Sequence, residues 1–219
     1  MNKLIIFGKG SVAQIAKNYF NDDSDFDVVA FTLDSDYIES ETYEGLPMVS
    51  FQRVQEVFPP DQYQMFIALS YTQMNKLRQN KYNEAKKKGY ILASYISSKC
   101  TYLSKHECGD NCFIFEDNTI QPYVEIGNNV ILWSGNHIGH HSIIKDHNFV
   151  SSHVVISGHC TIESNCFLGV NATLGHNVKV ARGTLLGAGV VLSKDTEENG
   201  VYVAPRPIKL DKSSKDIKL

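Results

Sequence analysis

The chain has 219 residues, which is enough for one large domain or two small ones. Its formal net charge is −3 and its charged residues are not gathered into blocks, which argues against nucleic acid or a membrane surface as a partner. No apolar run approaches the roughly 20 residues that span a bilayer. The first residues also lack the cleavage pattern of a secretory leader, so we expect a soluble, cytoplasmic protein.

The first part of the chain alternates apolar segments with amphipathic ones. We expect strands at residues 3–7, 26–32, 64–70 and 90–95. We expect helices at residues 12–20, 51–58 and 72–88, and a loop at residues 35–47. Strands that alternate with helices predict a small parallel α/β sheet. Residues 1–95 are therefore expected to form a Rossmann-like domain.

A glycine-containing turn follows the first expected strand. The segment from Gly8 to Ala13 fits the loose dinucleotide-binding pattern Gly-x-Gly-x-x-Gly/Ala. In that reading Gly8, Gly10 and Ser11 turn backbone N–H groups toward a phosphate, and Asp34 accepts a hydrogen bond from a ribose hydroxyl. A tight turn that needs glycine explains the motif equally well. Residues 1–95 hold no second mononucleotide half, so part of a nucleotide is expected rather than a whole NAD.

From residue 96 to residue 192 the chain follows a six-residue period. The positions that define it are all aliphatic: Ile114, Ile120, Ile126, Leu132, Ile138, Ile144, Val150, Ile156, Ile162, Leu168, Leu174, Val180, Leu186 and Leu192. This period is neither the 3.6 of a helix nor the alternation of a sheet. It fits a coil with three short strands per turn, in which each aliphatic residue points toward the axis. One coil cannot bury that face alone, so the coils must stack.

The five cysteines follow the same period. Four of them stand at the fifth position of a hexad: Cys100, Cys112, Cys160 and Cys166. We expect them to be small apolar core residues rather than a disulfide framework. A zinc site at Cys108 and Cys112 is not expected, because nothing nearby supplies two more ligands.

Seven of the eight histidines lie between His137 and His176. Since eighteen residues make one coil, His140 is expected beneath Gly158, and His141 beneath His159. Gly158 would leave a notch beside His140 and an N–H group that is free to bond. An imidazole beside such a notch suits general-base acyl transfer, and the N–H suits an oxyanion. The histidines on the other two edges, His147 and His153, are expected to be solvated.

The order of the two parts resembles one known family. A small domain with Gly-x-Gly precedes aliphatic-Gly-x-x-small-x repeats, as in the bacterial sugar O-/N-acyltransferases. These include sialic acid O-acetyltransferases and N-acetyltransferases of nucleotide-linked amino sugars. The resemblance spans residues 1–208. It implies that residues 1–95 bind a nucleotide sugar, that residues 96–208 form a left-handed parallel β-helix, and that the protein is a homotrimer. Residues 209–219 are expected to be a flexible tail.

The resemblance also implies an activity and a set of site residues. The expected reaction is acetyl-CoA-dependent acylation of the amine of a nucleotide-linked sugar used for surface polysaccharide or lipopolysaccharide, with no metal. His140 matches the catalytic base, and Gly158 matches the glycine whose N–H meets the acetyl carbonyl. His141 stands where the family commonly has Glu or Asp. The implied coenzyme A contacts are Gly158, His159, Gly175, His176, Ala188, Gly189 and Arg206. Asn75 and Arg78 match a recurrent Asn-x-x-Arg whose role the sequence does not explain.

Three other functions remain open. The chain could be a sugar O-acetyltransferase of the sialic acid type. It could be a zinc lyase of the carbonic anhydrase type, because His137, His140, His141 and His159 cluster. It could also be a non-catalytic nucleotide-sugar binder that uses the β-helix as a trimer scaffold.

Overall fold

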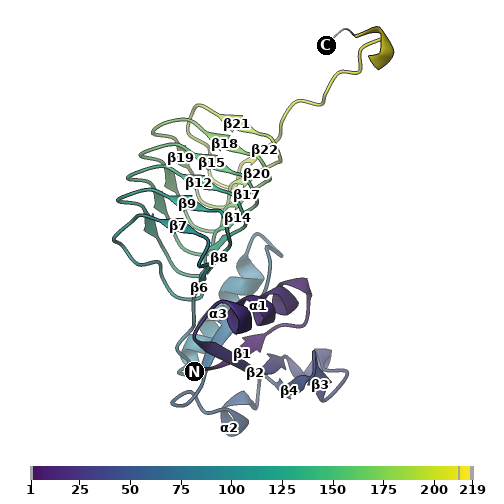
Figure 1. Ribbon diagram of the computed structural model, residues 1–219, viewed down its shortest axis with the longest axis vertical. Coiled ribbons are helices and arrows are strands. Elements are labelled where there is room, and N and C mark those ends of the chain that lie inside the picture. Colours follow the sequence, from purple (N-terminus) through teal and green to yellow (C-terminus); the bar gives the residue numbers. More distant parts are fainter. Residues whose placement is uncertain (1, 212, 218–219) are drawn as a thin grey trace.

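The computed structural model describes residues 2–211 and 213–217. The N-terminal unit, residues 2–94, consists of a small sheet with helices. It packs against a three-sided coil of short strands, residues 95–202, and residues 203–211 run away from the far end of that coil (Figure 1).

The N-terminal sheet contains β1 (Asn2–Phe7), β2 (Phe26–Leu33), β3 (Thr42–Tyr43), β4 (Leu46–Ser50) and β5 (Gln64–Ile67) in the order β3-β4-β2-β1-β5. All neighbouring pairs are parallel except β3 and β4. The helices are α1 (Ser11–Asp22), α2 (Val54–Val57) and α3 (Lys76–Lys87), with a 3-10 turn η1 (Ser35–Tyr37). In α1 the buried residues Ala13, Ala16 and Phe20 share one face, which is the spacing that packs a helix onto a sheet. The expected α/β sheet is present.

Two expected segments are shorter in the structure, since the helix expected at 51–58 is reduced to α2 and the strand expected at 64–70 to β5. Three others differ in kind. The expected loop at 35–47 contains η1, β3 and the first residues of β4. Its hairpin turn is Glu44-Gly45, and both residues have positive φ, at 48° and 77°. That is the backbone of a two-residue hairpin turn, but the usual Asn-Gly or Asp-Gly signal is absent from the sequence.

The other two differences lie where the N-terminal unit meets the coil. The expected helix at 72–88 begins only at Lys76, because Gln73, Met74 and Asn75 adopt left-handed backbone conformations. The expected strand at 90–95 is reduced to one bridge between Met65 and Leu92. Beyond that bridge the chain leaves the sheet and enters the coil.

The coil is formed by three parallel sheets. The seven-stranded sheet contains β6 (Tyr95–Ile96), β8 (Phe113–Ile114), β11 (Ile131–Leu132), β14 (Phe149–Val150), β17 (Phe167–Leu168), β20 (Leu185–Leu186) and β22 (Val201–Tyr202). The six-stranded sheet contains β7 (Thr101–Tyr102), β9 (Thr119–Ile120), β12 (His137–Ile138), β15 (Val155–Ile156), β18 (Thr173–Leu174) and β21 (Val191–Leu192). The four-stranded sheet contains β10 (Glu125–Ile126), β13 (Ile143–Ile144), β16 (Thr161–Ile162) and β19 (Lys179–Val180).

The six-residue period sets both the register and the core of the coil. Ile138 pairs with Ile120 before it and Ile156 after it, so each coil advances eighteen residues. The aliphatic positions from Ile114 to Leu186 are almost fully buried in one continuous core. Full burial of such a side chain contributes roughly 1.5–3 kcal/mol. Cys112, Cys160 and Cys166 are buried in the same core as expected, and all five cysteines are free thiols.

Each turn of the coil contains one left-handed residue, three positions after the aliphatic one. These residues recur without a gap every six positions: Asn111, Asp117, Tyr123, Asn129, Gly135, His141, His147, His153, His159, Asn165, Asn171, Asn177, Gly183 and Gly189. Asn, Asp and His are the non-glycine residues that best tolerate this backbone region. Part of the histidine-rich sequence is therefore explained by turn geometry.

Arg78 on α3 joins the N-terminal unit to the coil. Its side chain is fully buried, and its six hydrogen bonds all go to neutral oxygens. The acceptors belong to Ser70, Asn75, Asn129, His147 and Asn148. Burial lowers the pKa of this guanidinium to about 9. Asn75 also donates to the Cys166 carbonyl at 2.9 Å, so the Asn-x-x-Arg motif is a structural connection between the two units.

His147 is not solvated, contrary to expectation. Its side chain is only 8% exposed because α3 packs over its edge of the coil, where the His147 ring contacts Tyr82. His147 Nδ1 lies 2.9 Å from Asn129 Nδ2. Burial lowers the pKa of His147 to about 4. His153, on another edge, is exposed as expected.

The segment beyond the repeat adds one more strand, since β22 pairs with β20. A short 3-10 turn, η2 (Ser214–Asp216), lies within the expected tail. Residues 212, 218 and 219 of that tail lie outside the described residues. In the part of the chain that the structure describes, no helix is long and apolar enough to cross a membrane.

Candidate active site

Four histidines gather on one edge of the coil, between the six-stranded and four-stranded sheets. We call this the histidine edge: His140 and His141 in the turn after β12, His159 in the turn after β15, and His176 in the turn after β18. All four side chains are exposed. His137 lies on β12 itself and is half-buried.

His140 lies against the backbone of Gly158, as the repeat predicts. A Cβ atom added to Gly158 would lie 2.8 Å from His140 Cε1 and 2.9 Å from Nε2. These separations are shorter than van der Waals contact, so only glycine leaves room for the ring. The result is an exposed imidazole beside a backbone that carries no side chain.

The N–H group of Gly158 has no hydrogen-bond partner among the described residues. The corresponding N–H one coil earlier belongs to His140, and it donates to Gln121 Oε1 at 2.9 Å. The residue that matches Gln121 one coil later is Gly139, which has no side chain to accept the bond. A Cβ on Gly139 would lie 2.5 Å from the Gly158 nitrogen. Because position 139 carries glycine, this N–H group has no partner in the part of the chain that the structure describes.

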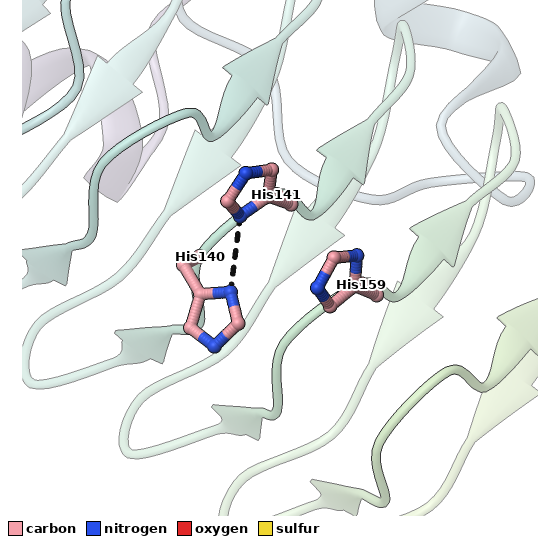
Figure 2. Close-up of side chains that lie close together, drawn as sticks. All are labelled: His140, His141 and His159. Atoms are coloured by element: carbon pink, nitrogen blue, oxygen red, sulfur yellow. Dashed lines mark hydrogen bonds between the residues drawn. The ribbon is translucent and has the colours of Figure 1, made fainter.

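His141 takes the position next to the His140 ring (Figure 2). The two Nδ1 atoms are 3.1 Å apart, so one ring donates a hydrogen bond to the other. His141 is also stacked between Tyr123 and His159, with ring centroids 4.6 Å and 4.8 Å away. This stacking holds the ring that replaces the expected carboxylate.

His159 is surrounded by the other three histidines. Its ring is nearly parallel to that of His141, at 11°, and nearly perpendicular to those of His140 and His176. Partial desolvation and repulsion from these neighbours lower the pKa of His159. One ring nitrogen from each of His140, His141 and His159 lies within 4.8 Å of the others.

The N-terminal loop contains two different kinds of glycine. Gly8 has φ of 131°, and a Cβ there would lie 2.9 Å from the Ala68 oxygen, so the turn itself requires glycine. Gly10 has no atom within 4 Å of an added Cβ. It precedes α1, whose N-terminus has no side-chain cap and no acidic residue in its first turn. Ser11 is exposed beside it.

Asp34 lies at the end of β2 and already has protein partners. Its Oδ1 atom is 2.9 Å from Lys81 Nζ and accepts a weaker bond from Gln52 at 3.4 Å. The structure thus places Asp34 in an ion pair close to the carboxyl end of the sheet. The sequence analysis missed this lysine, because α3 reaches Asp34 only through the folded sheet.

Comparisons with known proteins agree with this architecture. The family described as bacterial transferase hexapeptide (six repeats) matches residues 159–194. The six-residue repeat of the coil is therefore similar to that family's repeat over residues 159–194. By sequence, no curated protein matches the chain.

Solved structures match nearly the whole chain. The acetyltransferase domain of PglB from Neisseria gonorrhoeae FA1090 has a TM-score of 0.78 at 17% identity, covering 93% of this chain and 97% of that one. WeeI from Acinetobacter baumannii AYE has a TM-score of 0.79 at 18% identity, with the same coverage of 93% and 97%. A histidine variant of perosamine N-acetyltransferase from Caulobacter crescentus, in complex with CoA and GDP-perosamine, has a TM-score of 0.78 at 20% identity and coverage of 96% and 98%. The shared fold is a small N-terminal sheet domain followed by a left-handed parallel β-helix.

The remaining expected coenzyme A residues lie in three places. Gly175 and His176 continue the histidine edge one coil beyond Gly158. Ala188 and Gly189 lie on a different edge, in the turn between β20 and β21. Ala188 lines a cavity of about 400 Å³ together with Tyr71, Trp133, Phe149, Phe167 and Val170. Arg206 is exposed beyond β22.

Proposed function

We propose that this protein is an acyltransferase that moves an acetyl group from acetyl-CoA to the amine of a nucleotide-linked sugar. The observation that carries the proposal is the contact between the His140 ring and Gly158, whose N–H group has no partner among the described residues. The relatives of the same fold include structures with acetyl coenzyme A and with CoA and GDP-perosamine. These ligands belong to the class of reaction proposed here.

The proposed chemistry assigns one role to each group at this contact. His140 Nδ1 is hydrogen-bonded to His141, which leaves Nε2 as the base. Nε2 takes a proton from the acceptor amine while the amine nitrogen attacks the thioester carbonyl carbon. The Gly158 N–H stabilises the developing oxyanion. The C–S bond then breaks, and the sulfur leaves with CoA and takes up a proton.

His141 has a positioning role in this proposal. A neutral His141 accepts the hydrogen bond from His140 Nδ1–H and so holds Nε2 unprotonated toward the acceptor. It cannot offer the negative charge of a carboxylate to the imidazolium that forms. A charged hydrogen bond is roughly twice as strong as a neutral one, so the base is weaker than in a His–Glu pair.

The nucleotide part of the acceptor is assigned to the N-terminal loop. Gly10 leaves open space, and the uncapped start of α1 offers N–H groups to a phosphate. Gly8 shapes the turn, and Ser11 and Asp34 lie beside it. Residues 1–95 would then form the nucleotide-sugar domain and residues 96–208 the acyltransferase domain.

We also propose a homotrimer, because the two parts of the site are separated in one chain. The N-terminal unit forms hydrogen bonds with the edge of the coil that carries Asn129, His147 and Asn165. It also forms one with Glu116. Among the described residues, no hydrogen bond or aromatic contact joins it to the histidine edge. An acceptor held by the loop of one subunit would be presented to His140 of the next. The coenzyme would lie between two subunits. One subunit would supply Gly158, His159, Gly175 and His176, and the other would supply Ala188, Gly189 and Arg206.

Free thiol release from acetyl-CoA tests the proposed function with a panel of nucleotide-linked amino sugars. Thiol release that requires the amino sugar, and an N-acetylated product by mass spectrometry, support the proposal. Acetylation of a hydroxyl on a sugar without an amine would instead support the sialic acid type of O-acetyltransferase. The protein would be a binder only if it takes up the nucleotide sugar but neither binds nor consumes acetyl-CoA. The use of the product for surface polysaccharide is part of the same proposal.

A further inference from the structure

The histidine edge carries more imidazole than proton transfer requires. One base and one orienting partner account for His140 and His141, while His159 brings a third ring nitrogen within 4.8 Å of both (Figure 2). We propose that His140, His141 and His159 bind one divalent transition-metal ion, of which Zn²⁺ is the probe, and that this ion switches the site off. The switching part rests on the proposed function; the binding part does not.

The donor set suits such an ion. Imidazole nitrogen is a preferred zinc ligand, and three histidines with one open position form a complete protein ligand set. Two nitrogens at about 2.0–2.1 Å from a tetrahedral ion stand roughly 3.3 Å apart. The Nδ1 atoms of His140 and His141 are already 3.1 Å apart. Two of the three ligands are therefore close to the required spacing before any ion arrives.

The third ligand needs a small movement that its surroundings allow. The His159 ring lies parallel to His141, so it must turn for its lone pair to point at the shared ion. The side chain is exposed, and no hydrogen bond holds the ring among the described residues. The backbone of His141 and His159 is fixed by the stacked turns, with φ of 58° and 60°. His176 stands at 77° to the His159 ring and can orient it from the other side.

Metal binding and base catalysis exclude each other at His140. A neutral imidazole has one lone pair and one N–H. If the ion takes the lone pair of either ring nitrogen, the proton resides on the other nitrogen. His140 then has no lone pair left to accept a proton from the acceptor amine. Occupancy by the ion therefore removes the base without disturbing the fold.

The binding test uses the full-length protein and a chromophoric chelator that competes for Zn²⁺. The expected result is one zinc per chain that is lost selectively in His159→Asn. Asn stands at the matching turn position one coil later, Asn177, so the left-handed backbone is preserved. Loss of a residue that only hydrogen-bonds to a metal ligand already weakens metal affinity roughly 10–100-fold. Loss of the ligand His159 itself should therefore weaken zinc binding at least about tenfold.

His153→Asn is the matched control, because His153 is an exposed left-handed histidine on another edge. It should bind zinc as the wild type does. The proposal is overturned if the wild type takes no zinc from the chelator, or if His159→Asn binds as tightly as His153→Asn. A cobalt-substituted protein should also show nitrogen rather than thiolate coordination. A thiolate band would place the ion at the cysteines and contradict the proposal.

The switching part is tested separately by acetyl transfer. Added Zn²⁺ should inhibit thiol release over the concentration range in which it binds, and excess chelator should restore the rate. Activity that rises with zinc, or that chelation abolishes, would overturn the switch and favour a zinc enzyme. Zinc binding without any acetyl transfer would leave the metal site supported and the proposed function refuted, so the two failures are distinguishable.

Discussion

The imidazole of His140 occupies the space that a side chain at Gly158, eighteen residues later in the chain, would need. A Cβ on Gly158 would come within 2.8 Å of the ring. The pairing of Ile138 with Ile156 in neighbouring strands fixes this arrangement. The position of the proposed base His140 thus depends on glycine at position 158 in the next coil.

Gly158→Ala should abolish most of the activity while the coil remains folded. The added methyl group displaces the His140 ring and crowds the N–H group proposed to hold the oxyanion. Loss of one oxyanion donor costs about 10²–10³ in kcat, and a 1 Å misplacement of a reacting group costs about 10². We expect kcat for thiol release to fall at least about 100-fold. Gly187→Ala is the matched control, because its Cβ would meet its nearest neighbour at an ordinary 3.4 Å. Equal rates for the two variants would remove Gly158 from the mechanism.

His141→Glu should increase kcat, and His141→Asn should decrease it. A carboxylate beside His140 Nδ1 would stabilise the imidazolium that forms in the transition state, which a neutral imidazole cannot do. We expect each change to be several-fold to about tenfold. The turn tolerates Glu, since Glu44 adopts a similar left-handed φ of 48° elsewhere in the chain. Steady-state kinetics at fixed pH measure the effect, with the KM for acetyl-CoA as the check that binding is retained. A slower Glu variant would show that His141 does not stand in for a carboxylate.

The repeat made the coil and the histidine edge predictable. Once the six-residue period is fixed, residues eighteen apart are neighbours, so the contact between His140 and Gly158 follows from counting. The sequence also contains the cause of the free N–H group at Gly158. Gln121 accepts the matching bond in one coil, and the equivalent residue one coil later is Gly139, which has no side chain. The sequence analysis expected the free N–H group but not this cause of it, because the signal joins a side chain to a backbone group rather than two side chains.

Features that depend on docking between the two units were not predictable in this way. His147 has the same place in its hexad as His141, yet the first is buried and the second exposed. The difference arises because α3 covers one edge of the coil and not the other. The left-handed run before α3 likewise reflects contacts made by Asn75 with a strand end ninety-one residues away.

Arg78→Met should destabilise the protein strongly. The substitution leaves the carbonyl groups of Ser70, Asn129 and His147 without their donor, whereas the Asn148 carbonyl keeps the N–H of Ile131. An unsatisfied buried polar group costs about 1–3 kcal/mol, so the summed loss should reach at least about 3 kcal/mol. Chemical denaturation measures the free energy of unfolding. Arg53→Met is the control, because Arg53 is 72% exposed in a surface pair with Glu56 and should change stability by less than about 1 kcal/mol. Similar values for the two variants would show that the buried bonds are not important for docking.

The protein should lose stability as the pH falls from about 6.5 toward 4, owing to His147. Burial lowers the pKa of His147 from its ordinary 6.5 to about 4, while Asp146 and Asp110 oppose the shift and Arg78 adds to it. Because the folded pKa is depressed, the unfolded chain binds more protons in this window. The contribution is fully present above pH 6.5 and is lost as the pH falls through the window, on the order of 3 kcal/mol in all. His147→Asn, which keeps a neutral residue suited to the turn, should flatten this part of the stability curve. His106→Asn, at an exposed histidine, should leave it unchanged. Denaturation midpoints measured between pH 4 and 7 decide the matter, and a slope that survives in His147→Asn would assign the pH dependence to another group.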